Sequence, residues 1–85
     1  MQKTPTRTVF SEITDFLATN PAPEEIINYN LPEEHNSRAI ELLEKNGEGN
    51  LSTTEYDEMM DFVRVDQMLT LLKAKMRLKL KKASG

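Results

Sequence analysis

The sequence predicts an all-α fold, a small helical bundle with a helical hairpin and a long C-terminal helix. Apolar residues recur at intervals of three and four along most of the chain, which is the spacing of one face of a helix. Proline and glycine fall between these segments and therefore mark where helices end. The 85 residues form a single small helical domain, 1–85, with few residues to spare for a core. Dimerisation is one way to complete that core.

The first two helices are predicted in the N-terminal part of the chain. The first covers residues 9–19, with Thr8 as its N-cap and Pro21 as its stop. One or two helical turns follow from Pro23, because proline suits the first position of a helix. Residues 1–7 are expected to be disordered.

The third and fourth helices are predicted to form the hairpin. The third covers residues 32–45, with Ala39, Ile40, Leu42 and Leu43 as its apolar stripe, and it stops at "NGEGN". The fourth covers residues 53–81, a stretch without glycine or proline, and residues 83–85 are expected to be disordered. At 1.5 Å per residue this helix spans roughly 40 Å, which is longer than the third helix can cover.

The twelve residues "EKNGEGNLSTTE", 44–55, match the calcium loop of an EF-hand. The candidate ligands in that interpretation are Glu44, Asn46, Glu48, Asn50, Ser52 and Glu55. A glutamate stands where the motif has its first aspartate, and the chain has no second loop to pair with. The same residues also describe a metal-free turn, with a glycine ending one helix and a capping box, "STTE", starting the next. We favour this turn and predict no cofactor.

The long helix is apolar over a wide arc. Such a helix is either central to a bundle or docked on a second chain. We predict core and interaction surface together, formed by Met59, Phe62, Val65, Met68, Leu69, Leu72 and Met76. A patch around Met68, Leu72 and Met76 is expected to stay exposed and to mediate association, either as a homodimer or with another protein.

The charges divide along the chain. Residues 24–66 hold twelve acidic side chains against three basic ones, a balance of −9. Residues 67–85 hold no acidic side chain, and a basic patch of Lys73, Lys75, Arg77, Lys79, Lys81 and Lys82. This patch can contact nucleic-acid phosphates, an acidic protein surface, a membrane face or a second protomer. Nucleic acid is not favoured, since no aromatic residue lies in the patch to stack on bases.

The composition argues against an enzyme. The chain has no cysteine and no glycine-rich phosphate loop. The one histidine, His35, is assigned to an exposed polar face of the third helix, beside Glu34 and Asn36. We therefore predict no catalytic residues. No signal peptide or apolar span is apparent in the sequence, so we expect a cytoplasmic protein without a membrane span.

The order and spacing of several short motifs resemble a family of small all-helical bacterial proteins, found notably in cyanobacteria. In this sequence the motifs are "PEEII" at 23–27, "LLEKN" at 42–46, "GNL" at 49–51, "STTE" at 52–55 and "LLKAK" at 71–75. The family has no established catalytic role, and its members resemble products of genes beside HNH-nuclease or toxin-like genes. The resemblance implies a non-enzymatic protein–protein interaction module, an antitoxin-like or accessory partner of a nuclease or toxin-like protein. The alternatives are a single EF-hand-like calcium-binding protein, or nucleic-acid binding through the basic helix end.

Overall fold

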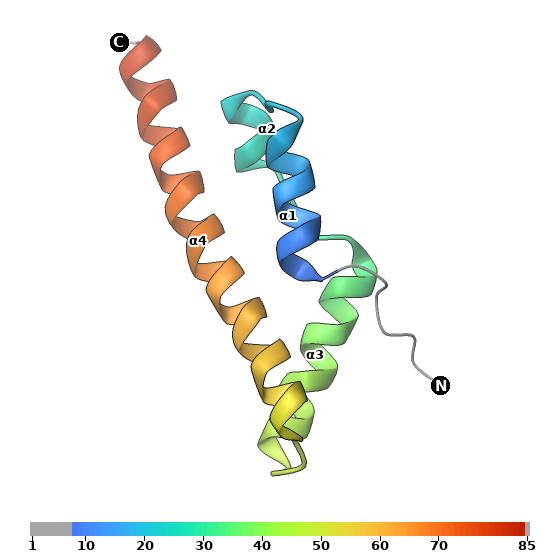
Figure 1. The fold of residues 1–85 in the computed structure, drawn as a ribbon. Helices are drawn as coiled ribbons and strands as arrows, with labels where there is room; N and C mark the ends of the chain where they lie inside the picture. Colours follow the sequence, from blue (N-terminus) through green and yellow to red (C-terminus); the bar gives the residue numbers. More distant parts are fainter. Residues whose placement is uncertain (1–7, 85) are drawn as a thin grey trace.

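Four α-helices make up the protein in a computed structural model that describes residues 8–84 (Figure 1). They are α1 (Val9–Ala18), α2 (Pro23–Ile27), α3 (Glu33–Gly47) and α4 (Thr53–Ser84). No strand occurs among the described residues. The predicted all-α class with a long C-terminal helix is confirmed.

The first two helices begin and end where the local sequence dictates. The Thr8 side chain accepts a hydrogen bond of 3.0 Å from the Ser11 N–H and so caps α1. After α1, Asn20 takes a positive φ of 59°, a conformation that asparagine tolerates better than most residues. Glu25 accepts a hydrogen bond of 2.9 Å from the Ala22 N–H, which fixes the start of α2.

The length of α4 sets the shape of the molecule. Its 32 residues amount to about 48 Å at 1.5 Å per residue, and the longest extent of the protein is 50 Å. The radius of gyration is 15.2 Å, against about 12 Å for a compact chain of this length. α3 lies beside the first part of α4, α1 beside its middle, and α2 beside its second half (Figure 1).

Four predicted boundaries change, of which two move by one residue: α1 ends at Ala18 rather than residue 19, and α3 begins at Glu33 rather than residue 32. α3 continues to Gly47 rather than ending at residue 45, and α4 continues to Ser84. Residues 83 and 84 are therefore helical, so the expectation of disorder there was wrong. The apolar and basic residues of α4 carry on the helical pattern, and no glycine or proline interrupts it before residue 85. Residues 1–7 and 85 lie outside the described residues.

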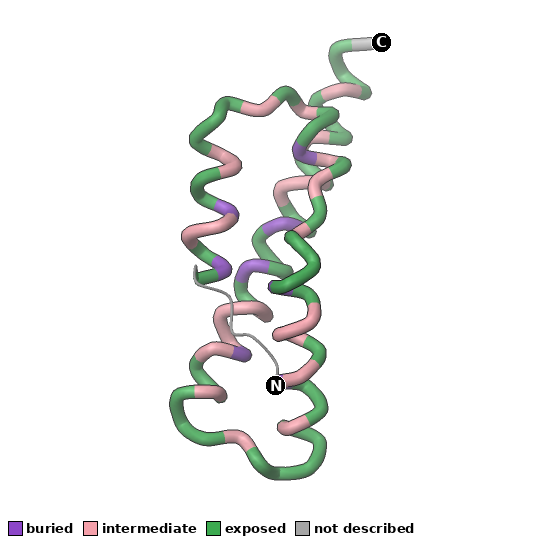
Figure 2. The backbone as a smooth tube through the Cα atoms, turned by 90° about the vertical axis from the view of Figure 1, so that its right-hand side faces the viewer, coloured by how far each residue is buried: buried purple, intermediate pink, exposed green. Residues whose placement is uncertain are grey.

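The core forms where α1 packs on the middle of α4. Its buried residues are Val9, Ile13, Val65 and Leu69, with Phe16, Leu17, Tyr29, Leu31 and Phe62 packed around them. The rings of Phe16 and Tyr29 stack with their centroids 4.1 Å apart, which attaches the end of α2 to α1. Figure 2 shows buried residues on the inner sides of the helices, whereas the hairpin turn and the C-terminal end of α4 are mostly exposed.

His35 is buried, with 1% of its surface exposed, so its assignment to an exposed polar face was wrong. The physical reason is helical periodicity. His35 lies seven residues before Leu42, which is fully buried, and two residues at that spacing share one face of a helix. Its polar neighbours in the sequence, Glu34 and Asn36, remain exposed.

Candidate functional site

An apolar groove runs between α3 and α4. It has a volume of about 280 Å³ and is lined by Leu31, Asn36, Ala39, Leu43, Met59, Phe62, Val63 and Asp66. Only Asn36 and Asp66 among these are polar. The groove is therefore suited to apolar side chains from another molecule, with one polar residue contributed by each helix.

Helical spacing brings the groove residues together. Met59, Phe62, Val63 and Asp66 are separated by three and four positions, so they share one face of α4. On α3, Ala39 and Leu43 stand one turn apart, and Leu43 is 57% exposed. The neighbouring Ile40, also 57% exposed, extends the apolar surface along α3. These two exposed side chains enlarge the apolar surface next to the groove.

The seven residues predicted as core and interaction surface divide into three groups. Met59, Val65 and Leu69 are buried, so they belong to the core. Phe62, Leu72 and Met76 are half-buried, and Met68 is exposed. Among the seven, Met59 and Phe62 also line the groove.

The sequence predicted an exposed patch around Met68, Leu72 and Met76, but the structure leaves only Met68 of these three exposed. Leu72 and Met76 are half-buried because both α1 and α2 pack against α4. The sequence-based prediction considered the third and first helices as cover and left out the short α2. Sequence reasoning also missed Leu43 and Val63 as surface residues. The available signal was the stripe on α3, which is wider than contact with one neighbouring helix requires.

A network of ion pairs ties α3 to α4. The Arg38 guanidinium donates to both carboxylate oxygens of Glu58, through Nε at 2.8 Å and Nη2 at 2.7 Å, and to Glu41 at 2.6 Å. The hydrogen bond with Glu58 is the largest of the causes that raise the pKa of Arg38. These carboxylates are therefore held by a cation, and they do not form an unpaired acid–base couple for catalysis.

The turn between α3 and α4 has a metal-free geometry. Gly49 has a φ of 74°, its N–H donates to the Asn46 carbonyl at 3.1 Å, and the Asn50 N–H donates to the Lys45 carbonyl at 2.9 Å. This pair of hydrogen bonds is a Schellman motif. The Ser52 hydroxyl accepts from the Glu55 N–H and the Glu55 carboxylate accepts from the Ser52 N–H, both at 3.1 Å, so the predicted capping box is confirmed.

The candidate calcium ligands are not arranged as an EF-hand. Glu44 and Asn46 lie within α3 and Glu55 lies within α4, so only residues 48–52 connect the two helices. The Glu55 carboxylate also accepts from Lys45 at 2.6 Å, and this hydrogen bond is the main reason that the pKa of Glu55 is lowered to about 2.

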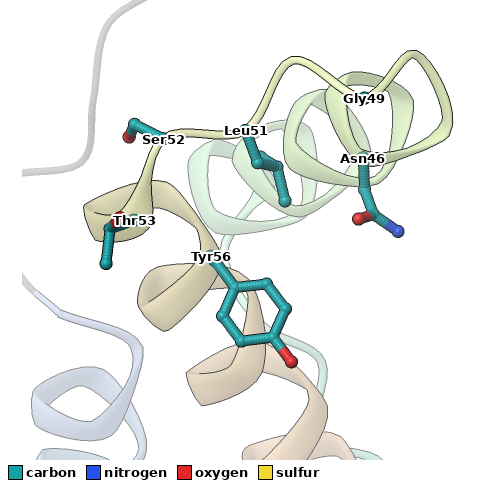
Figure 3. A pocket seen from close by; sticks show the side chains of 6 residues that line it. All are labelled: Asn46, Gly49, Leu51, Ser52, Thr53 and Tyr56. Carbon is teal, nitrogen blue, oxygen red and sulfur yellow. The ribbon is translucent and has the colours of Figure 1, made fainter.

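The pocket beside this turn also differs from a calcium site. Figure 3 shows the Leu51 side chain extending toward the ring of Tyr56 there. The lining residues are Asn46, Gly49, Leu51, Ser52, Thr53 and Tyr56, none of which carries a carboxylate. Calcium sites in proteins depend on carboxylate oxygens. The geometry therefore favours the hairpin turn over the calcium interpretation.

The six cations of the predicted basic patch have different roles. Lys73 donates to the Tyr29 carbonyl at 2.7 Å, just after α2, and so stabilises the end of that helix. The other five side chains are exposed. Lys75, Lys79 and Lys82 share one face of α4 by their spacing, whereas Arg77 and Lys81 share another. The basic patch is thus two stripes rather than one surface.

The fold defines a small all-α protein whose hairpin carries an apolar groove. Within residues 8–84, none of the helices combines the length and apolar character that crossing a membrane requires. Comparison of the chain with known protein families, curated proteins and solved structures finds no match.

Proposed function

We propose that the protein is a non-enzymatic interaction module that binds an amphipathic helix of a partner protein in the groove between α3 and α4. The observation that carries this proposal is the apolar lining of the groove, continued on α3 by the exposed Leu43 and Ile40. A helix laid in such a groove buries apolar residues spaced at three and four positions, a common mode of peptide recognition.

The charge around the groove specifies the chemistry of the partner. The groove lies in the acidic part of the chain, residues 24–66, where the balance is −9. Asp66 lines the groove, and Glu44 lies next to Leu43 on α3. A partner helix with basic residues flanking its apolar row is therefore favoured in rate of association and in specificity. We assign the groove to a basic helix of another protein.

The resemblance to the bacterial family supplies a type of partner. A nuclease or toxin-like protein that acts on nucleic acid carries a basic surface, because it must approach phosphates. An acidic module that covers part of such a protein would act as an antitoxin-like or accessory subunit in the cytoplasm. This assignment depends on the resemblance, whereas the docking of a basic helix depends on the groove itself.

Two leucines of nearly equal exposure provide a matched test. Leu43 is 57% exposed and lines the groove, and Leu71 is 59% exposed and does not line it. Each is changed to aspartate, and binding of a designed peptide with an apolar row and lysines on its other faces is measured by calorimetry. Leu43→Asp should weaken binding at least about tenfold, because a charge is placed against apolar side chains. Leu71→Asp should bind as the unchanged protein does.

A second peptide and a hydrodynamic measurement complete the test. A peptide with the same apolar row and glutamates in place of the lysines should bind more weakly, and the difference should shrink at high salt. Equal binding by the two leucine variants would show that the peptide does not bind in the groove. A dimer that dissociates in Leu43→Asp, seen by sedimentation, would make a second copy the occupant and overturn the assignment to a basic partner. A purified nuclease or toxin-like protein encoded nearby is then tested with the same variants.

Nucleic-acid binding is the competing hypothesis, and the stripe of Lys75, Lys79 and Lys82 on one face of α4 favours it. Its signature is binding to duplex DNA that weakens steeply with salt and is lost when the three lysines are changed to glutamine. Such binding, with no affinity for the basic peptide, would replace the interaction-module proposal.

A further inference from the structure

Glu12 from α1 meets Glu34 and His35 from the start of α3. One ligand atom from each residue lies within 4.8 Å of the other two. Their side chains provide one imidazole and two carboxylates from segments more than twenty positions apart in the sequence. His35 is buried, the Glu12 side chain is 19% exposed, and Glu34 is exposed. The cluster therefore has a buried inner ligand and an outer ligand in contact with solvent.

The spacing of the inner pair fits two ligands of one ion. His35 Nε2 and Glu12 Oε1 are 3.3 Å apart. This contact is also a long hydrogen bond between the two side chains, since charge-assisted hydrogen bonds are typically about 2.7–2.9 Å. Two ligands on a tetrahedral zinc ion with bonds near 2.0 Å are separated by about 3.3 Å. The Glu34 side chain is exposed and can turn to complete a third position.

Hydrogen bonding does not account for the buried polar atoms near this cluster. Among the described residues, His35 Nδ1 and the Tyr29 hydroxyl are buried without a hydrogen-bond partner. A buried histidine with an unpartnered ring nitrogen is costly for folding alone. The nitrogen that would bind an ion is Nε2, which faces Glu12, whereas Nδ1 stays without a partner.

We propose that Glu12, Glu34 and His35 bind a first-row divalent metal ion, best matched by Zn²⁺ with water in the fourth position. An imidazole with two carboxylates suits zinc better than calcium or magnesium, which prefer oxygen ligands alone. Zinc-bound histidines normally donate their second N–H to a partner, and His35 Nδ1 has none. The affinity is accordingly expected in the micromolar range, below that of structural zinc sites. The ion would tie α1 to α3 and thereby stabilise the fold.

Two adjacent glutamates provide the test. Glu33 and Glu34 are both exposed in the first turn of α3, and only Glu34 belongs to the cluster. Changing either to glutamine removes one negative charge from the same helix end, so the effect on the helix dipole is matched. Zn²⁺ binding is measured by calorimetry and by the thermal unfolding midpoint, and Co²⁺ binding by its visible absorption.

The unchanged protein and Glu33→Gln should bind one ion and unfold at a higher temperature with zinc than with chelator. Glu34→Gln should bind at least about tenfold more weakly while keeping its helical circular dichroism. Equal zinc affinities in the two variants would mean that Glu34 contributes only its charge, and this result would overturn the site. A lack of saturable zinc binding in the unchanged protein would overturn it as well. The peptide-binding experiments on the groove are run in chelator, so the two proposals fail separately.

Discussion

Replacing Arg38 by methionine should remove the strongest link between α3 and α4. The Arg38 side chain is 12% exposed, and its partners Glu58 and Glu41 are 31% and 28% exposed. A hydrogen bond to a charged group is worth about 1.5–3 kcal/mol when well buried, and a solvent-exposed ion pair about 0.2–1 kcal/mol. Since the carboxylates are partly solvated, we expect a net cost of about 2 kcal/mol, although three hydrogen bonds are lost. Methionine preserves most of the apolar packing of the arginine stem.

Urea unfolding followed by circular dichroism measures this cost, and the thermal midpoint should fall by roughly 10 °C. Arg64→Met is the matched control, because Arg64 is 62% exposed and pairs with Asp61 at 3.5 Å, and it should change stability by less than about 0.5 kcal/mol. Arg38→Lys should lose part of the stability, because lysine lacks the planar fork that engages both oxygens of Glu58. An Arg38→Met cost no larger than that of Arg64→Met would refute the reasoning.

The hairpin turn yields two further predictions. Gly49→Ala should destabilise by about 1–2 kcal/mol because of its φ of 74°, whereas Gly47→Ala, in the last turn of α3, should stabilise by up to about 1 kcal/mol. An added Cβ meets nothing within 4 Å at either position, so equal effects in urea unfolding would contradict this backbone argument. The pKa of Glu55 is lowered from 4.5 to about 2, so its contribution to stability is full above about pH 4.5 and is lost as the pH falls toward 2. In Glu55→Gln the free energy of unfolding should fall less steeply as the pH is lowered from about 4.5 to 2. An unchanged dependence on pH would exclude Glu55 as a source of the acid sensitivity.

Local signals in the sequence were sufficient to predict the helices. Thr8, Pro23, Gly49 and Ser52 each act on backbone groups within four positions, so their effects can be read without knowledge of the fold. The end of α3 moved by two residues because Gly47 stays helical and the left-handed residue is Gly49.

The candidate sites were harder to predict because they depend on which helix covers which. The burial of His35 requires that the start of α3 meets Glu12 of α1 and Phe62 of α4, and its pairing with Glu12 spans twenty-three positions. The exposure of Leu43 requires that no other described segment covers that side of the hairpin. Neither arrangement follows from spacing within one helix, since periodicity identifies a face and not its neighbour.

The two halves of α4 meet different requirements, and this decides where a partner would bind. In the second half, Leu72 and Met76 are half-buried where α1 and α2 pack, whereas Leu71 and Leu78 stay exposed, and Lys73 already supports the end of α2. The first half packs on α3 and, at Phe62 and Val65, also on α1, and these helices leave part of its wide apolar arc uncovered. The uncovered part of that arc lines the groove with Val63 beside Leu43. What distinguishes the acidic half is this groove, since the exposed Leu71 and Leu78 of the second half do not line it, and a groove in acidic surroundings favours a basic helix as its ligand.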